Sequence, residues 1–351
     1  MKLSIRRFTG GIGGAHNASR RWDSRSGLLI ELYAGSVRGL GEASPLPGYS
    51  PDSLESSQSA LGALNLTALE HALNLEDTGT SLRAVVDLLP ITQPAARMAL
   101  ETAALDLRGR QCRVSAPALL GTAPGAERAL AWLAGSADTR ALDTIRGAQR
   151  AGYDHFKLKL GRPGNLEAEM AALRELRRAL GRGPRLRLDA NRGWTESQAR
   201  RACGVLGSLD IEFLEEPHGT HTPLGGTSVA TALDESLQGV APDDLDALAR
   251  HSGARFVILK PMVLGGLSHC MELARRASAL GLGVVVSHSF DGPVAFAAAA
   301  ALALSIPTRS AQGLAPHPGL AAWPATALPI ARATLRTWHG PGLGLTSDWP
   351  D

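Results

Sequence analysis

Cysteine, aromatic residues and lysine are all scarce in this 351-residue chain. The three cysteines, Cys112, Cys203 and Cys270, include no C-x-x-C pair, which excludes a disulfide-stapled scaffold and a zinc ribbon and favours a reducing compartment. Aromatic residues make up only 4% of the chain and are not interleaved with the basic residues. Although the net charge is +3, we therefore expect no nucleic-acid partner.

Long hydrophobic runs are also missing. The first ten residues, MKLSIRRFTG, lack the apolar stretch of a signal peptide. The longest apolar run, residues 293–306, is mostly alanine and too short to cross a bilayer. We therefore expect a cytoplasmic protein with no membrane partner. The hydrophobic fraction of 44% and charged fraction of 20% predict a folded chain with one large domain or two unequal ones.

Lysine provides only four of the 36 basic residues, at Lys2, Lys157, Lys159 and Lys260. The last three lie in short, apolar, strand-like segments, where a generic solvated charge is out of place. Arginine keeps its proton near neutral pH, whereas the environment of a lysine can be tuned to release one. The pattern favours a need for a titratable amine at these three positions over simple snorkelling at strand ends.

The N-terminal third predicts a small α+β domain over residues 1–115. Alternating apolar residues indicate antiparallel strands at 2–8 and 27–42, joined through a glycine-rich segment that contains TGGIGG. Helical periodicity follows at 51–74 and 93–110. The TGGIGG segment lacks the spacing of a phosphate-binding loop, so we expect a glycine-rich loop there and no nucleotide site.

Strand and helix patterns alternate over residues 116–324, which predicts the second domain. The candidate strands are Ala129–Ala134, Phe156–Leu160, Leu186–Ala190, Phe213–Glu216, Ala232–Glu235, Phe256–Lys260, Val284–Ser287 and a weak Gln312–Leu314. Eight short strands, all but the last followed by a helix, fit a (β/α) barrel better than an open doubly wound sheet.

Charged and polar residues recur where these strands end, which is where barrel enzymes carry their catalytic groups. In chain order they are Lys157 and Lys159, Asp189 and Asn191, Glu215 and Glu216, Asp234 and Glu235, Lys260, and Ser287 and Ser289. Side chains alternate along a strand, so Lys157 and Lys159 share one face, as do Arg187, Asp189 and Asn191. Packing alone does not explain three carboxylates on successive strands between lysines, so we favour a catalytic site over a structural salt-bridge network.

Asp189, Glu215 and Asp234 offer three carboxylate ligands that converge on one point. Hard oxygen ligands without histidine or thiolate favour Mg²⁺, with Mn²⁺ as a substitute. A divalent cation there polarises a substrate carboxylate and stabilises the charge left when an α-proton departs. The sequence therefore predicts a magnesium enzyme acting on a small-molecule carboxylate.

The three lysines of the strand-like segments supply the proton chemistry. Two nearby ammonium groups disfavour each other's charged form, so we expect Lys157 to help Lys159 act as a base. Lys260, on the sixth strand, is expected to face the substrate from the opposite side.

Five segments together resemble the enolase superfamily, specifically its muconate lactonising enzyme subgroup. In chain order they are FKLKLG, LRLDANRGW, FLEEP, ALDES and VILKPMVLGG. The resemblance covers nearly the whole chain and implies an α/β fold: a modified (β/α)₇β TIM-like barrel with an α+β capping domain. It implies that the C-terminal tail, 325–351, packs on the capping domain and that Glu216 and Glu235 support the metal ligands. Lysine with Mg²⁺ is an established catalytic pairing in this superfamily.

Within the subgroup, the segment GEASPLPGYS at 41–50 and Arg187 before the metal ligand resemble o-succinylbenzoate synthases. The last predicted strand, which carries a glycine and is followed by Trp-Pro, also resembles the corresponding segment of these synthases. Residues 312–315 carry no acid, which argues against a substrate with a free amine. The substrate contacts expected on this basis are Arg187, Asn191, Ser287, Ser289 and Gly313.

This resemblance implies a carbon–oxygen lyase of menaquinone biosynthesis. The expected reaction is the syn-dehydration of 2-succinyl-6-hydroxy-2,4-cyclohexadiene-1-carboxylate to 2-succinylbenzoate through a metal-stabilised enediolate. Lys159 would take the α-proton and return it to the departing hydroxyl, while Lys260 would stabilise the enediolate electrostatically.

The alternative is an N-succinylamino acid racemase or dipeptide epimerase, in which Lys159 and Lys260 both move protons. A non-catalytic binding barrel does not fit the complete set of lysines and carboxylates. The motifs do not separate synthase from racemase, and they leave open the oligomeric state and the role of His288. Strand alternation predicts that Ser287 and Ser289 face the ligand while His288 points the other way.

Overall fold

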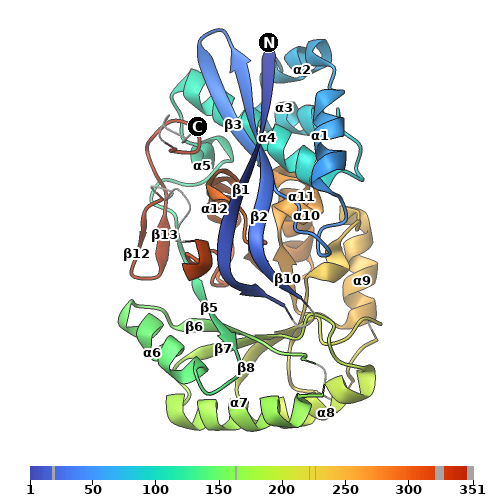
Figure 1. Ribbon diagram of the computed structural model, residues 1–351, viewed down its shortest axis with the longest axis vertical. Coiled ribbons are helices and arrows are strands. Elements are labelled where there is room, and N and C mark those ends of the chain that lie inside the picture. Colours follow the sequence, from blue (N-terminus) through green and yellow to red (C-terminus); the bar gives the residue numbers. More distant parts are fainter. Residues whose placement is uncertain (18–19, 163, 221, 226, 321–327, 346–351) are drawn as a thin grey trace.

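The computed structural model describes residues 1–351 except 18–19, 163, 221, 226, 321–327 and 346–351. An antiparallel sheet with helices forms one part of the molecule, and a curled parallel sheet surrounded by helices forms the other (Figure 1). This is the TIM-like barrel with an α+β capping domain that the sequence predicts. The domain boundaries themselves, 1–115, 116–324 and the tail, stay a prediction.

The capping part holds three antiparallel strands in the order β1-β2-β3. Its elements are β1 (Lys2–His16), β2 (Arg21–Ala34), β3 (Val37–Ala43), α1 (Leu54–Gly62), α2 (Leu66–Leu73), α3 (Thr78–Val86), α4 (Pro94–Cys112) and α5 (Ala116–Leu119). The long helix α4 packs closely on β3 because β3 has glycines at the contact. A Cβ atom on Gly41 would lie 2.0 Å from the carbonyl oxygen of Ala99, so any larger residue would push the helix away.

The glycine-rich segment after Phe8 is not the loop that the sequence analysis expects. Strand β1 continues to His16, and Gly10 and Gly11 pair with Arg25 and Ser24 of β2. The register shifts between Gly11 and Ala15, which marks a β-bulge. Glycine permits the bulge without ending the strand, so the hairpin reaches as far as the barrel: the Nε2 atom of His16 lies 3.1 Å from the hydroxyl of Ser136.

Seven parallel strands form the barrel sheet, in the order β11-β10-β9-β8-β7-β6-β5. The strands are β5 (Ala131–Ser136), β6 (His155–Lys159), β7 (Arg185–Asp189), β8 (Ile211–Glu215), β9 (Thr231–Leu233), β10 (Phe256–Leu259) and β11 (Gly283–Val286). The helices that accompany them are α6 (Ala141–Arg150), α7 (Leu166–Leu180), α8 (Glu196–Leu206), α9 (Leu245–Ser252), α10 (Pro261–Leu264), α11 (Leu267–Ala279) and α12 (Pro293–Ser305), with 3₁₀ turns η1 (Glu235–Leu237), η2 (Pro242–Asp244) and η3 (Pro318–Leu320).

The weak eighth strand closes the barrel through two residues only. Gln312 bridges to Leu130 beside β5, and Gly313 bridges to Ser287 beyond β11. The amide of Gly313 donates to the carbonyl of Val286 at 2.8 Å. The sheet is therefore closed where the sequence places its last strand, although the pairing is too short to form a regular strand.

The C-terminal tail returns to the first part of the chain. Strand β12 (Ile330–Ala331) pairs with β13 (Thr334–Arg336), and β13 in turn pairs with β4 (Glu127–Ala129). Beyond them, the amide of Leu343 donates to the buried carboxylate of Asp106 in α4 at 2.8 Å. Of the predicted tail 325–351, residues 325–327 and 346–351 lie outside the described residues, as does the Trp-Pro pair at 323–324.

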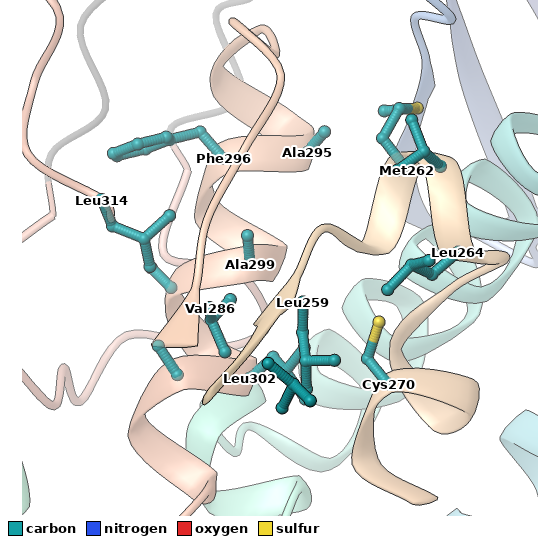
Figure 2. Close-up of a cluster of buried hydrophobic side chains, with 14 of the residues drawn as sticks. Leu259, Met262, Leu264, Cys270, Val286, Ala295, Phe296, Ala299, Leu302 and Leu314 are labelled. Atoms are coloured by element: carbon teal, nitrogen blue, oxygen red, sulfur yellow. The ribbon is translucent and has the colours of Figure 1, made fainter. Parts of the chain in front are cut away.

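Helix α12 is buried on nearly all sides, as its long alanine run predicts. Figure 2 shows its residues Ala295, Phe296, Ala299 and Leu302 beside strand residues such as Val286 in one apolar cluster. This packing holds the ends of β10 and β11, from which site residues project. No helix in the described part of the chain is long and apolar enough to cross a membrane.

Candidate active site

A cavity of about 850 Å³, including its open mouth, lies at the C-terminal ends of the barrel strands. The side chains that line it include Lys157, Lys159, Arg187, Asn191, Glu215, Lys260, Ser287, His288, Ser289 and Gly313 from the barrel, His317, and His16, Asn17, Trp22, Leu46 and Tyr49 from the capping part. Both parts of the molecule therefore build the cavity.

The three predicted metal ligands meet at this end of the sheet. Asp189 ends β7, Glu215 ends β8 and Asp234 directly follows β9. One carboxylate oxygen from each lies within 4.8 Å of the others, and all three side chains are buried. Among the residues that the structure describes, no other such group of acidic, histidine or cysteine residues occurs.

The electrostatics of this group fit a hard divalent cation. Burial, reinforced by the charges of Asp189 and Asp234, raises the pKa of Glu215 to about 7 although the Lys157 ammonium opposes it. Burial likewise raises the pKa of Glu235 to about 8, with Asp234 and Asp189 adding to the effect. Part of each shift comes from repulsion between neighbouring carboxylates, which a bound divalent cation would relieve, and an all-carboxylate donor set is what Mg²⁺ and Mn²⁺ prefer.

The three lysines of the cavity each lie against a metal-site carboxylate. The ammonium of Lys157 is 2.9 Å from Asp189 and also contacts Glu215. Lys159 donates to Asp189 at 2.9 Å and to the side-chain oxygen of Asn191 at 3.2 Å. Lys260 pairs with Asp234 from the other side of the group.

These carboxylates change the expected role of Lys157. Burial favours its neutral form, but Asp189 and Glu215 outweigh burial and raise the pKa of Lys157. Similarly, Asp234 and Glu235 outweigh burial and raise the pKa of Lys260. The expectation that repulsion between two ammonium groups dominates is therefore incomplete, because it omits the carboxylates one and two strands away.

Glu216 and Glu235 lie beside the predicted metal ligands, and their supporting role stays a prediction. Glu216 accepts hydrogen bonds from the amides of Asp234 and Ser236, both at 2.8 Å, and pairs with Arg192 at 3.0 Å. It thereby fixes the turn that presents Asp234. Glu235 accepts from the side-chain amide of Asn191 at 3.0 Å, which orients the Asn191 oxygen toward Lys159.

The predicted substrate contacts differ in whether their polar groups already have hydrogen-bond partners within the protein. Arg187 is buried and already pairs with Glu212 at 2.7 Å, and it also donates to the carbonyl of Ala311. Ser287 donates to the carbonyl of Gly313 at 3.2 Å. In contrast, Ser289 lines the cavity, and its buried hydroxyl has no hydrogen-bond partner among the described residues. Their roles as substrate contacts stay predictions.

The expectation that His288 points away from the cavity is wrong. Strand β11 ends at Val286, so alternation no longer governs the residues after it, and Phe290 has a positive φ of 57°. His288 consequently lines the cavity beside both serines. Burial, with the positive charge of Lys260 and other groups, lowers the pKa of His288 to about 3, so its ring is neutral near neutral pH.

Tyr49 is the site residue that the sequence analysis misses, although it lies in the segment singled out at 41–50. Its hydroxyl accepts a hydrogen bond from Lys260 at 2.6 Å and donates to Asp234 at 3.2 Å. His16 also reaches the cavity, because β1 is longer than expected. Tyr49 could have been identified from its place in the motif at 41–50. No motif or hydrophobic periodicity around His16 indicates a site residue.

Comparison with known proteins identifies the family. Residues 140–351 match the family model described as Enolase C-terminal domain-like. The chain belongs to the enolase superfamily. Residues 16–81 of this superfamily member match a second model, described as MenC, N-terminal domain.

Relatives within the superfamily carry different activities. An o-succinylbenzoate synthase from Citrobacter koseri is 30% identical over 332 residues, which cover 88% of this chain and 90% of that protein. Muconate cycloisomerase 1-1 from Acinetobacter lwoffii is 30% identical over 288 residues, covering 78% and 74%. The solved muconate lactonizing enzyme from Pseudomonas fluorescens superimposes with a TM-score of 0.85 over 99% of this chain and 96% of that one, at 24% identity, which shows a shared fold.

Proposed function

We propose that this superfamily member is an o-succinylbenzoate synthase that dehydrates 2-succinyl-6-hydroxy-2,4-cyclohexadiene-1-carboxylate. The observation that carries the proposal is the charge of the cavity wall. Among the described residues that line the cavity, the only carboxylate is Glu215, a predicted metal ligand, whereas three lysines and an arginine line it. These cations are themselves paired with carboxylates, so the decisive feature is that no described lining carboxylate outside the predicted metal site is left to bind a substrate ammonium group, which favours a substrate that has none. The MenC match over 16–81 supports the same choice.

In the proposed reaction Lys159 takes the proton alpha to the ring carboxylate and returns it to the hydroxyl that leaves from the same face. Asn191 holds the Lys159 amine through its side-chain oxygen, at 3.2 Å. When bound at Asp189, Glu215 and Asp234, Mg²⁺ would polarise the substrate carboxylate and offset the negative charge that develops on it. Lys260, held by Tyr49, adds positive charge on the opposite face.

N-succinylamino acid racemisation is the second candidate, because the two lysines contact different carboxylates of the metal group. Lys159 extends from β6 to Asp189, and Lys260 follows β10 and pairs with Asp234. Two bases placed in this way can serve both faces of one carbon atom. Dipeptide epimerisation is less well supported, since Gln312 and Gly313 leave the last strand without an acid to bind an amine.

A genetic test separates these functions in a cell. The chain is expressed in a bacterium that lacks its own o-succinylbenzoate synthase and therefore makes no menaquinone. We expect wild type to restore menaquinone and the Lys159→Ala variant, at equal protein level, to fail. Absence of menaquinone with a stable wild-type protein would contradict the proposal.

A further inference from the structure

A buried ion pair joins the capping part to the barrel beside the cavity. Arg25 lies on β2, and Asp291 lies in the loop between β11 and α12, 266 residues later. Their guanidinium and carboxylate groups are 3.2 Å apart, and the two side chains are 0% and 1% exposed. Burying two charges is costly unless they are paired and hydrogen-bonded, so a pair kept here suggests a specific task.

The pair is part of a hydrogen-bond network between segment 41–50 and the loop after β11. Arg25 also donates to the carbonyl of Ser44, and the Ser44 hydroxyl donates to Glu42 at 2.6 Å. Glu42 in turn accepts from the amide of Gly292 at 2.7 Å and from that of Ala295 at 3.1 Å, at the start of α12. Segment 41–50 of the capping part is thus tied to the loop after β11.

The same network reaches the cavity through Ser289. The Asp291 oxygen that pairs with Arg25 also accepts from the backbone amide of Ser289 at 3.3 Å. Between them, Phe290 has a φ of 57°, a conformation that is unfavourable for a bulky residue and must be held by its surroundings. Ser289 is one of the residues that line the cavity, and its buried hydroxyl has no hydrogen-bond partner among the described residues.

We infer that Arg25 and Asp291 are positioning residues, which fix the loop after β11 so that the Ser289 hydroxyl donates to a carboxylate oxygen of the substrate. The inference rests on the proposed function only for the identity of that substrate. Neither Arg25 nor Asp291 lines the cavity, so both act through Ser289. Because the pair joins the two parts of the molecule, productive binding of the substrate also depends on contact between the capping part and the barrel.

A purely structural ion pair would make different predictions. Removing it would lower thermal stability but leave the Michaelis constant of the surviving folded enzyme unchanged. Positioning through Ser289 instead predicts that Asp291→Asn and Ser289→Ala raise KM by about tenfold each, the loss of roughly one hydrogen bond, with kcat within about threefold of wild type. Their combination should raise KM no further, because both remove the same contact.

The experiment is a double-mutant cycle on the full chain with Mg²⁺. It compares wild type, Asp291→Asn, Ser289→Ala and the double variant. The substrate is the cyclohexadiene carboxylate, or an N-succinyl amino acid if the latter is the only one that wild type turns over. Asp291→Glu, which retains a charged acceptor, should recover most of the wild-type KM. Arg110→Gln is the matched control, because it breaks a pair with the buried Asp106 far from the cavity lining; it should leave KM unchanged.

Hydrogen exchange gives a readout that does not depend on the substrate. The peptide that contains residues 287–292 should exchange about tenfold faster in Asp291→Asn than in wild type and no faster in Arg110→Gln. Unchanged exchange, or KM increases that multiply in the double variant, would overturn the positioning role. Failure of wild type to dehydrate the cyclohexadiene would overturn the proposed function alone, since exchange and the cycle on the other substrate still decide the positioning role.

Discussion

Replacing Lys260 by arginine separates the two leading activities, because it keeps the positive charge but ends proton cycling. Arginine stays protonated at any pH at which the enzyme works. The Lys260 ammonium is buried between Asp234 and the Tyr49 hydroxyl, and its side chain is 8% exposed.

The rate loss expected for each Lys260 variant depends on whether Lys260 acts through its charge or as a proton carrier. In the dehydration Lys260 acts through its charge, which contributes about 3 kcal/mol for unit charges roughly 5 Å apart at an effective dielectric constant of about 20. Lys260→Met loses that charge and should slow dehydration by about a hundredfold. Lys260→Arg retains most of it and should lose about tenfold or less. Racemisation needs Lys260 as a proton carrier, so there both variants should lose roughly 10²–10⁴-fold or more.

Two assays on the same preparations measure these losses. Consumption of the cyclohexadiene is followed by its ultraviolet absorbance, and racemisation of an N-succinyl amino acid by proton NMR and optical rotation. Lys159→Ala serves as the inactive reference for both. A Lys260→Arg enzyme that folds, binds Mg²⁺ and yet dehydrates no faster than Lys159→Ala would refute the electrostatic role of Lys260.

Three further predictions follow from the site and the core. Activity should vanish in excess chelator and return with Mg²⁺ or Mn²⁺, and Asp234→Asn should weaken Mg²⁺ binding in calorimetry by at least about tenfold; full turnover in chelator would contradict the metal site. Tyr49→Phe should lower kcat by roughly 10- to 100-fold, because Lys260 loses a charge-assisted hydrogen bond, with little change in melting temperature; an unchanged kcat would remove Tyr49 from the site. Burial raises the pKa of Glu101 to about 7 despite opposing hydrogen bonds from Ser268, so the folded state binds the extra proton and Glu101 costs stability as pH rises from about 4.5 to 7. Denaturant unfolding of wild type and Glu101→Gln at pH 5 and 7.5 should show their stability difference shifting by about 2.4 kcal/mol toward the variant at the higher pH, and a constant difference would show that Glu101 stays ionised.

The barrel and its strand ends were predictable because they depend on local periodicity. Strands with polar residues at their C-terminal ends must bring those residues to one edge of a closed parallel sheet, so the convergence of Asp189, Glu215 and Asp234 follows from spacing alone. Closure itself was harder to predict, since Gln312 and Gly313 form bridges rather than a regular strand.

Contacts between distant segments could not be predicted in this way. Tyr49 reaches Lys260 across 211 positions, and Arg25 reaches Asp291 across 266. Such pairs depend on how the capping part sits on the barrel, which no local pattern encodes. The predicted orientation of His288 is wrong for a related reason. Side chains alternate in direction only within a strand, and β11 ends at Val286.

The charge of the cavity wall leads to one decisive measurement, the ratio of kcat/KM values for competing substrates on purified wild-type protein with Mg²⁺. The substrates are the cyclohexadiene carboxylate, an N-succinyl amino acid, a hydrophobic dipeptide and cis,cis-muconate. The proposed function predicts the highest kcat/KM for the cyclohexadiene carboxylate and the lowest for the dipeptide, whose ammonium finds no free carboxylate in the described wall. Efficient turnover of an N-succinyl amino acid, a dipeptide or muconate with the cyclohexadiene left untouched would contradict it.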